Sequence, residues 1–229
     1  MTAIGEQATA AGRAIEYDSF RLIDEEAGPH DYTEAQWPLV RRLIHASADF
    51  DFNGLTAFHP DAIEAGLAAA RKGGTPIIAD VEMIRAGLSV PRLDHFGMSA
   101  RCFISDPDVI ERAWAEDGTR ATHAMRKAHR QGGLDGAIVG IGNAPTALLE
   151  TLRLIREENA RPALVIGMPV GFVSAAESKA RLMEIETVPW ISIRGRKGGS
   201  TLVVAAVHAL LALAGARRGG EAGHGRDGR

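Results

Sequence analysis

Short apolar runs alternate along the chain with longer stretches in which apolar residues recur every three or four positions. The short runs predict β-strands, and the longer stretches predict amphipathic helices. We expect strands at Thr75–Ala79, Ala100–Ile104, Gly136–Ile141, Ala163–Ile166 and Trp190–Ile193. Alternating strands and helices predict a three-layer α/β fold, with a mostly parallel sheet of about five strands and helices on both faces.

The helical stretches follow the strands, so each crossover connection is expected to be right-handed. Two or three further helices are expected before the first strand. The helices between and after the strands are predicted at Asp80–Ala86, Pro107–Gln131 (with a break near Gly118), Thr146–Glu158, Ala175–Ile185 and Ser200–Ala214.

The two ends of the chain differ from this pattern. Residues 215–229 contain no apolar side chain larger than alanine, which predicts a disordered tail. Residues 1–12 are expected to be flexible as well. The ordered part is then a single α/β domain over residues 13–214, without an internal boundary in composition.

Composition and charge exclude several classes of protein. The formal net charge of −3 argues against non-specific binding to nucleic acid. No apolar run reaches about 18 residues, so no membrane partner is expected. The only cysteine, Cys102, excludes an intrachain disulfide and suits a small core position. With no signal-peptide pattern at the N-terminus, we expect a cytoplasmic protein.

Three loops follow the ends of predicted strands and share a glycine-rich design. They are Gly140–Pro145, Met168–Val173 and Arg194–Ser200. Ligands of parallel α/β proteins bind at this edge of the sheet, so we expect the three loops to form one pocket. The second loop offers apolar surface and exposed backbone suited to a large flat ligand. Candidate contacts in the first two loops are Asn143, Met168, Val170 and Gly171.

The third loop has two interpretations. Backbone N–H groups at Gly198–Ser200 begin a predicted helix and can bind a carboxylate or phosphate beside Arg194 and Arg196. Gly199 and Ser200 are then candidate contacts. Alternatively, Ser200 is a helix N-cap with solvated basic neighbours. Composition and spacing leave both interpretations open.

Cofactor motifs are absent from the sequence. Pro145 stands where the dinucleotide fingerprint needs its third glycine, and no phosphate-binding loop of the Gly-x-x-x-x-Gly-Lys-Ser/Thr type occurs. No histidine or cysteine cluster has the spacing of metal ligands. No Gly-x-Ser-x-Gly motif supports a serine hydrolase. We therefore expect no cofactor and no protein-bound metal.

Two Ser/Thr-x-x-Glu/Gln patterns predict helix N-termini, at Thr33 and at Ser174. The helix after Thr33 carries a core face of Trp37, Val40 and Ile44.

Arg42 and His45 share another face of that helix, so replacing either should spare the fold. Histidine moves protons near neutral pH, and arginine can hold a carboxylate through two hydrogen bonds. The alternative is a surface histidine favoured by the helix dipole.

Several strings together resemble the precorrin-8X methylmutases of cobalamin (vitamin B12) biosynthesis, whose anaerobic-pathway members act on cobalt-precorrin-8. The similarity runs from about Ile15 to Ala212. The strings are Arg-Arg-Leu-Ile-His45, Ala-Asp80-Val-Glu-Met83, Gly142-Asn-Ala-Pro-Thr-Ala-Leu148, Gly167-Met-Pro-Val-Gly-Phe-Val173, Ala176-Glu-Ser-Lys179 and Arg194-Gly-Arg-x-Gly-Gly-Ser200.

This resemblance implies an isomerase that moves a methyl group from C-11 to C-12 of the tetrapyrrole, giving hydrogenobyrinate or cobyrinate. It implies that His45 handles the proton, that Ser19 and Arg42 contact the substrate, and that the protein is a homodimer. A sigmatropic shift needs a ligand held in a reactive geometry and a proton-handling group, but no cofactor. The alternative is a non-catalytic tetrapyrrole carrier. The sequence leaves open whether the substrate carries cobalt.

Overall fold

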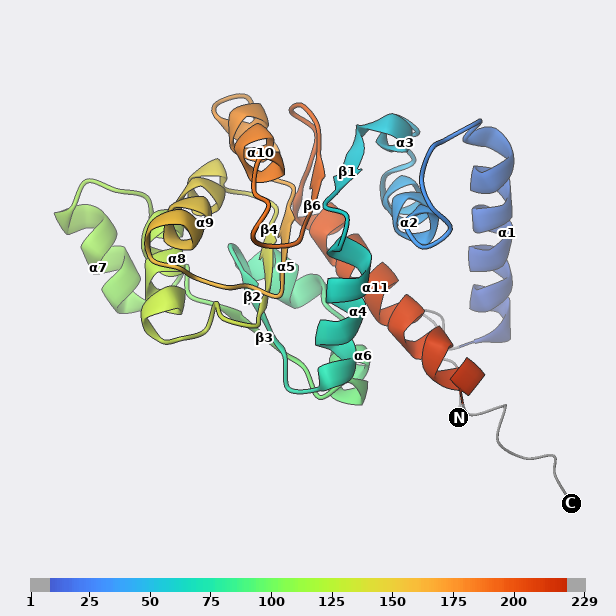
Figure 1. Ribbon diagram of the computed structural model, residues 1–229, viewed down its shortest axis with the longest axis horizontal. Helices are drawn as coiled ribbons and strands as arrows, with labels where there is room; N and C mark the ends of the chain where they lie inside the picture. The colour runs from blue at the N-terminus through green and yellow to red at the C-terminus, as the bar shows by residue number, and fades with distance from the viewer. Residues whose placement is uncertain (1–8, 222–229) are drawn as a thin grey trace, which may run out of the picture.

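The computed structural model describes the backbone of residues 9–221 and the side chains of residues 9–216 (Figure 1). Its centre is a six-stranded sheet in the order β1-β6-β5-β4-β2-β3. The strands are β1 (Thr56–Phe58), β2 (Pro76–Ala79), β3 (Ser99–Cys102), β4 (Ile138–Ile141), β5 (Leu164–Gly167) and β6 (Trp190–Ile193). The predicted α/β fold is thus confirmed.

One strand was not predicted. β1 pairs antiparallel with β6, with Thr56 opposite Ile193 and Phe58 opposite Ile191. All other pairs are parallel. The chain leaves β2 toward β3 in one direction and runs from β4 through β5 to β6 in the other. The strand order therefore reverses between β2 and β4, which is the place where open α/β sheets bind ligands.

Helices cover both faces of the sheet. One apolar core cluster joins the sheet to helices that include α2, α4 and α11, and the second joins it to helices that include α8, α9 and α10. Figure 1 shows these two groups on opposite sides of the strands. The helices are α1 (Ala10–Glu26), α2 (Trp37–Ser47), α3 (Phe52–Leu55), α4 (Ala62–Lys72), α5 (Glu82–Gly87), α6 (Val90–His95), α7 (Pro107–Ala115), α8 (Arg120–Arg130), α9 (Pro145–Glu157), α10 (Ala175–Met183) and α11 (Ser200–Glu221).

Helix boundaries agree with the sequence at some places and differ at others. The predicted break near Gly118 separates α7 from α8. α11 ends at Glu221, beyond the predicted end at Ala214, whose side chain is fully buried. The helix therefore enters the stretch expected to be a disordered tail. Residues 1–8 and 222–229 lie outside the described part of the chain, so flexibility at the two ends stays a prediction.

The two predicted helix starts have different outcomes. At Thr33 the two side-chain hydrogen bonds of the pattern form: the Thr33 hydroxyl accepts from the Gln36 N–H at 3.2 Å, and the Gln36 side chain accepts from the Thr33 N–H at 3.1 Å. They close a turn, however, and α2 begins only at Trp37, with Gln36 as its N-cap. At Ser174 the prediction is wrong. Ser174 has a φ of 58° and its side chain makes no capping hydrogen bond.

Candidate active site

The three glycine-rich loops lie together at the carboxyl edge of the sheet. The Gly199 N–H donates to the Met168 carbonyl at 2.9 Å, and the Gly171 N–H donates to the Arg196 carbonyl at 3.2 Å. A Cβ on Gly142 would lie 2.6 Å from the Ser200 Cα, so only glycine allows this approach. The three loops therefore meet, and the single ligand pocket that they were expected to form stays a prediction.

Asp80 organises the first loop and was not among the predicted contacts. Its fully buried carboxylate accepts from the backbone N–H groups of Gly142 at 3.1 Å, Asn143 at 2.9 Å and Ala144 at 2.7 Å. Burial raises the pKa of Asp80, and the backbone donors oppose that rise. Its position directly after a buried strand at the switch point is a signal that sequence reasoning could have used.

The second loop exposes apolar side chains. Phe172 and Val173 are each 84% exposed and Val170 is 47% exposed. Met168, in contrast, is fully buried in the core. Its side chain therefore has no surface to offer a ligand, contrary to the sequence expectation, and its carbonyl positions Gly199.

The start of α11 differs from the expected free anion site. The Gly199 N–H is already engaged with Met168, and Ser200 is buried against Gly142. Asn143, Arg194 and Arg196 remain exposed at this edge. An incoming anion therefore meets side chains more readily than the helix terminus.

Lys197 links the third loop to the segment after α2. Its ammonium lies 2.5 Å from Asp49 and 2.6 Å from Asp51. The hydrogen bond from Lys197 lowers the pKa of Asp49. The Arg194 N–H donates to the Leu55 carbonyl at 2.8 Å. The Lys197 ion pairs and the Arg194 hydrogen bond thus connect the third loop to the segment that begins at Asp49, four residues after His45.

Arg42 and His45 share one aromatic ring, Phe20 on α1, and Ser19 lies next to Phe20 in the sequence. The exposed His45 lies in the last turn of α2 and packs edge-on against Phe20, with ring centroids 5.2 Å apart. The Arg42 guanidinium lies 4.6 Å from the centre of the same ring. Ser19 precedes Phe20, and its hydroxyl donates to the Ile15 carbonyl at 2.8 Å.

Arg42 is less accessible than its place on the helix suggested. It is only 8% exposed and forms an ion pair with Glu16 at 2.7 Å. The expectation that Arg42 lies on a face free of packing is therefore wrong. A ligand carboxylate that binds Arg42 must share it with Glu16 or displace that side chain.

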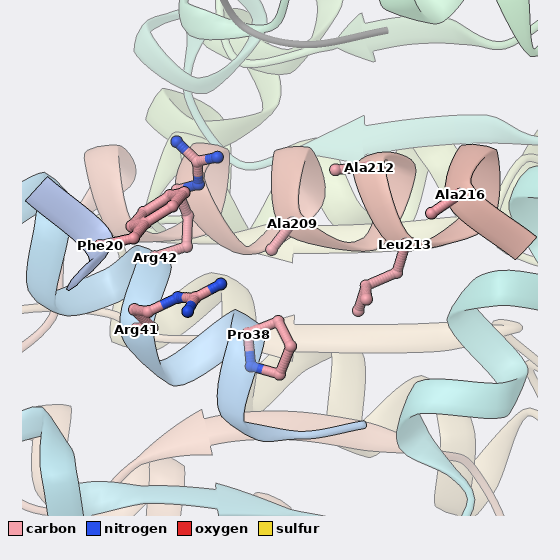
Figure 2. A pocket seen from close by; sticks show the side chains of 8 residues that line it. All are labelled: Phe20, Pro38, Arg41, Arg42, Ala209, Ala212, Leu213 and Ala216. Carbon is pink, nitrogen blue, oxygen red and sulfur yellow. The ribbon is translucent and has the colours of Figure 1, made fainter. Parts of the chain in front are cut away.

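A cavity of about 270 Å³ opens between α1, α2 and α11 (Figure 2). Figure 2 shows the Arg42 and Phe20 side chains close together at one end of it. Its volume is slightly below the range of about 300–1,000 Å³ typical of ligand pockets, so it could hold only part of a large ligand. The lining residues are Phe20, Pro38, Arg41, Arg42, Ala209, Ala212, Leu213 and Ala216.

Two other expectations concern metals and thiol chemistry. Within the described residues, no group of three or more His, Cys, Asp and Glu side chains could hold a metal ion. Cys102 lies partly buried on the edge strand β3, and burial raises the pKa of its thiol to about 11. A thiol of that kind is a poor nucleophile at neutral pH.

Comparison with known proteins identifies the family. The family model of precorrin-8X methylmutase (CbiC) matches residues 14–213. The chain belongs to the precorrin-8X methylmutase family. The members of this family are methylmutases, which are intramolecular transferases of the isomerase class.

Related proteins are similar in sequence to this chain over nearly their whole length. The cobalt-precorrin-8 methylmutase of Leptospira interrogans is 51% identical, with 92% of this chain and 98% of that protein covered. The precorrin-8X methylmutase of a Sinorhizobium species is 38% identical over 87% of this chain and 93% of that protein. The crystal structure of the precorrin-8X methylmutase from Thermus thermophilus is 53% identical, with a TM-score of 0.84, and covers 90% of this chain and 98% of that one.

Proposed function

We propose that this methylmutase moves the C-11 methyl group of cobalt-precorrin-8 to C-12, with His45 as the proton-handling residue. The observation that carries this assignment is the packing of Arg42 and His45 against the same ring, Phe20, within a chain that belongs to the methylmutase family. The shift itself needs no nucleophile. The protein must hold the ring in a reactive geometry and give or take a proton as conjugation changes.

The surroundings of Arg42 and His45 suit a flat ring with a carboxylate periphery. Arg42 supplies a charge-assisted contact to one carboxylate, and the exposed Arg194 and Arg196 face solvent at the sheet edge. Val170 and Phe172 offer apolar surface to the ring. The ion pair between Lys197 and Asp49 connects the loops at the sheet edge to the segment that follows the helix of Arg42 and His45. Together they support one extended site rather than separate sites.

We propose the cobalt-bearing substrate over the metal-free one. The relatives named cobalt-precorrin-8 methylmutase from Leptospira interrogans and Priestia megaterium are each 51% identical to this chain. The precorrin-8X methylmutases of Sinorhizobium and Pseudomonas aeruginosa are each 38% identical. The Thermus thermophilus protein, at 53% identity, carries the name of the whole family, so its name does not decide between the two substrates. The metal here belongs to the substrate, not to the protein.

We also propose that the protein is a cytoplasmic homodimer. Apolar side chains as exposed as Phe172 and Val173 are commonly covered by a partner, and two-fold dimers are the commonest oligomers. No helix in the described part of the chain is long and apolar enough to cross a membrane.

Anaerobic incubation of the enzyme with cobalt-precorrin-8 and, separately, with precorrin-8X tests the function. We expect the absorption spectrum of the rearranged product with both substrates and a higher kcat/KM with the cobalt form. A protein that binds the product but converts neither substrate would be a carrier. Faster conversion of the metal-free substrate would overturn the cobalt preference alone.

A further inference from the structure

Lys179, on α10, is a buried ammonium without a carboxylate partner. Its side chain is fully buried, and it is the largest of the fully buried side chains. The ammonium donates a hydrogen bond to the Lys197 carbonyl at 2.5 Å. Among the described residues, it forms no ion pair. Buried charges are normally paired, so this lysine needs an explanation.

The charge lies beneath the loop that joins β6 to α11. By fixing the Lys197 carbonyl, Lys179 supports the turn that carries Gly198 and Gly199 past Met168. The same turn directs the Lys197 side chain toward Asp49, near the end of α2. Lys179 therefore contacts the point at which the sheet-edge loops are connected to the helix of His45.

Three carboxylates in this region already have partners. Asp49 and Asp51 pair with Lys197, and the buried Asp80 carboxylate accepts hydrogen bonds from the backbone of the first loop. The positive end of the α11 dipole adds to the positive potential. The basic side chains on and beneath the loop are Lys179, Arg194, Arg196 and Lys197.

We propose that Lys179 is a positioning and specificity-determining residue whose counter-charge is a carboxylate of the bound tetrapyrrole. Resting on the proposed function, this inference explains why the fold holds an uncompensated charge there. Without ligand, burial disfavours the ammonium and lowers the pKa of Lys179 to about 8. A tetrapyrrole carboxylate bound over the loop would stabilise the charged ammonium of Lys179. Binding sites commonly sacrifice stability in this way.

Lys179→Met tests the proposal, because methionine has a similar length and no charge. Affinity is measured by titrating the metal-free product, hydrogenobyrinic acid, and following its visible spectrum. We expect the dissociation constant to rise about ten-fold or more, while the melting temperature stays equal or rises. KM should rise more than kcat falls. Lys179→Arg, which keeps the charge, should recover part of the affinity.

Arg181→Met is the matched control. Arg181 is exposed on the same helix, so this variant removes one positive charge without touching the loop. We expect its affinity to match that of the wild type.

The pH dependence of affinity separates a charge effect from a merely structural one. The affinity of the wild type should fall toward that of Lys179→Met as the pH rises above 8, because the ammonium then loses its proton. An affinity of Lys179→Met within two-fold of the wild type would overturn the proposal. So would a ratio of the two affinities that does not change with pH, because the lysine would then act only through packing. If the wild type itself fails to bind or convert the tetrapyrrole, the proposed function fails instead.

Discussion

His45 is exposed and its ring packs edge-on against Phe20, so its replacement separates chemistry from folding. We expect His45→Ala to lower kcat by about 100-fold or more, the usual scale for losing general acid–base assistance. Product affinity should change little, because the carboxylate contacts remain. Stopped-flow turnover and product titration measure the two quantities.

His95 offers a close control for this variant. It is also exposed in the last turn of a helix and lies edge-on against a phenylalanine, Phe96, at 4.9 Å. We expect His95→Ala to have the same melting temperature as His45→Ala and to keep the turnover of the wild type. Near wild-type turnover in His45→Ala would show that the mechanistic assignment is wrong.

Arg42 is expected to matter for both stability and binding. Because Arg42 and Glu16 are both nearly buried, Arg42→Ala leaves a carboxylate without its counter-charge. We expect a loss of about 3 kcal/mol in the free energy of unfolding. KM should rise, and Arg42→Lys should recover it only in part, because an ammonium cannot form the paired hydrogen bonds of a guanidinium.

The exposed pair Arg21–Glu25 is the control for this ion pair. Its separation is 2.6 Å, close to the 2.7 Å of Arg42–Glu16, but its side chains are 50% and 56% exposed. Arg21→Ala should lose much less stability than Arg42→Ala and leave KM unchanged. Equal losses of stability in the two variants, measured by urea unfolding, would contradict the role of burial.

Among the elements, the first loop depends on a side chain from another strand end. Asp80→Asn keeps the shape of Asp80 but turns an NH₂ group toward a backbone N–H donor. We expect the free energy of unfolding to fall by about 3 kcal/mol, because buried donors lose their acceptor. Turnover should fall as well, because Gly142 no longer holds its place against Ser200.

Asp135→Asn controls for the change of charge. Asp135 is exposed and accepts one backbone N–H, from Arg161, at 2.7 Å. Its variant should lose less than about 1 kcal/mol, the usual limit for surface substitutions. If Asp80→Asn and Asp135→Asn have the same melting temperature, the three hydrogen bonds of Asp80 contribute little to the stability of the fold.

The sequence predicted β2, β4, β5 and β6 because each is an apolar run that is buried over nearly its whole length, a local signal. The edge strand β3 is only partly buried. The sequence did not predict β1, because three residues carry no periodicity and the strand depends on its pairing with β6. The cap at Ser174 was mispredicted for a related reason. A capping box needs an extended backbone at its first residue, and the loop sets the φ of Ser174 to 58°.

The site was predictable where the signal lies in the loop motifs. The three glycine-rich loops were expected to come together at one edge of the sheet, and they do. Burial was not predictable. Arg42 is covered because Glu16 lies opposite it on another helix, and Met168 is covered because its side chain lies in the apolar core that includes residues of α2, α4 and α11. Such contacts join positions far apart in the sequence, which a helical or strand period cannot reveal.

For the whole molecule, the burial of Lys179 predicts how stability changes with pH. The folded-state pKa of about 8 lies below the ordinary value of 10.5, so above pH 8 the unfolded chain binds more protons than the folded one. The wild type should therefore gain stability relative to Lys179→Met as the pH rises from 8 to 10.5, by up to about 3 kcal/mol.

Urea unfolding at several pH values measures this difference. Lys72→Met, which removes an exposed lysine from α4, provides the comparison. A difference curve for Lys179→Met that coincides with the curve for Lys72→Met would contradict the prediction.

Assembly of the whole molecule is expected to depend on the apolar loop between β5 and α10. If Val170, Phe172 and Val173 pack against a second copy, light scattering at micromolar concentration should give the mass of a dimer. Phe172→Ser removes a large apolar contact and should shift the protein toward monomer.

Trp114, on α7, is equally exposed at 84% but belongs to a distant helix (Figure 1). Trp114→Ser should therefore leave the dimer intact. A monomeric wild type with full activity would contradict the assembly, and a dimer lost in Trp114→Ser but kept in Phe172→Ser would place the interface elsewhere.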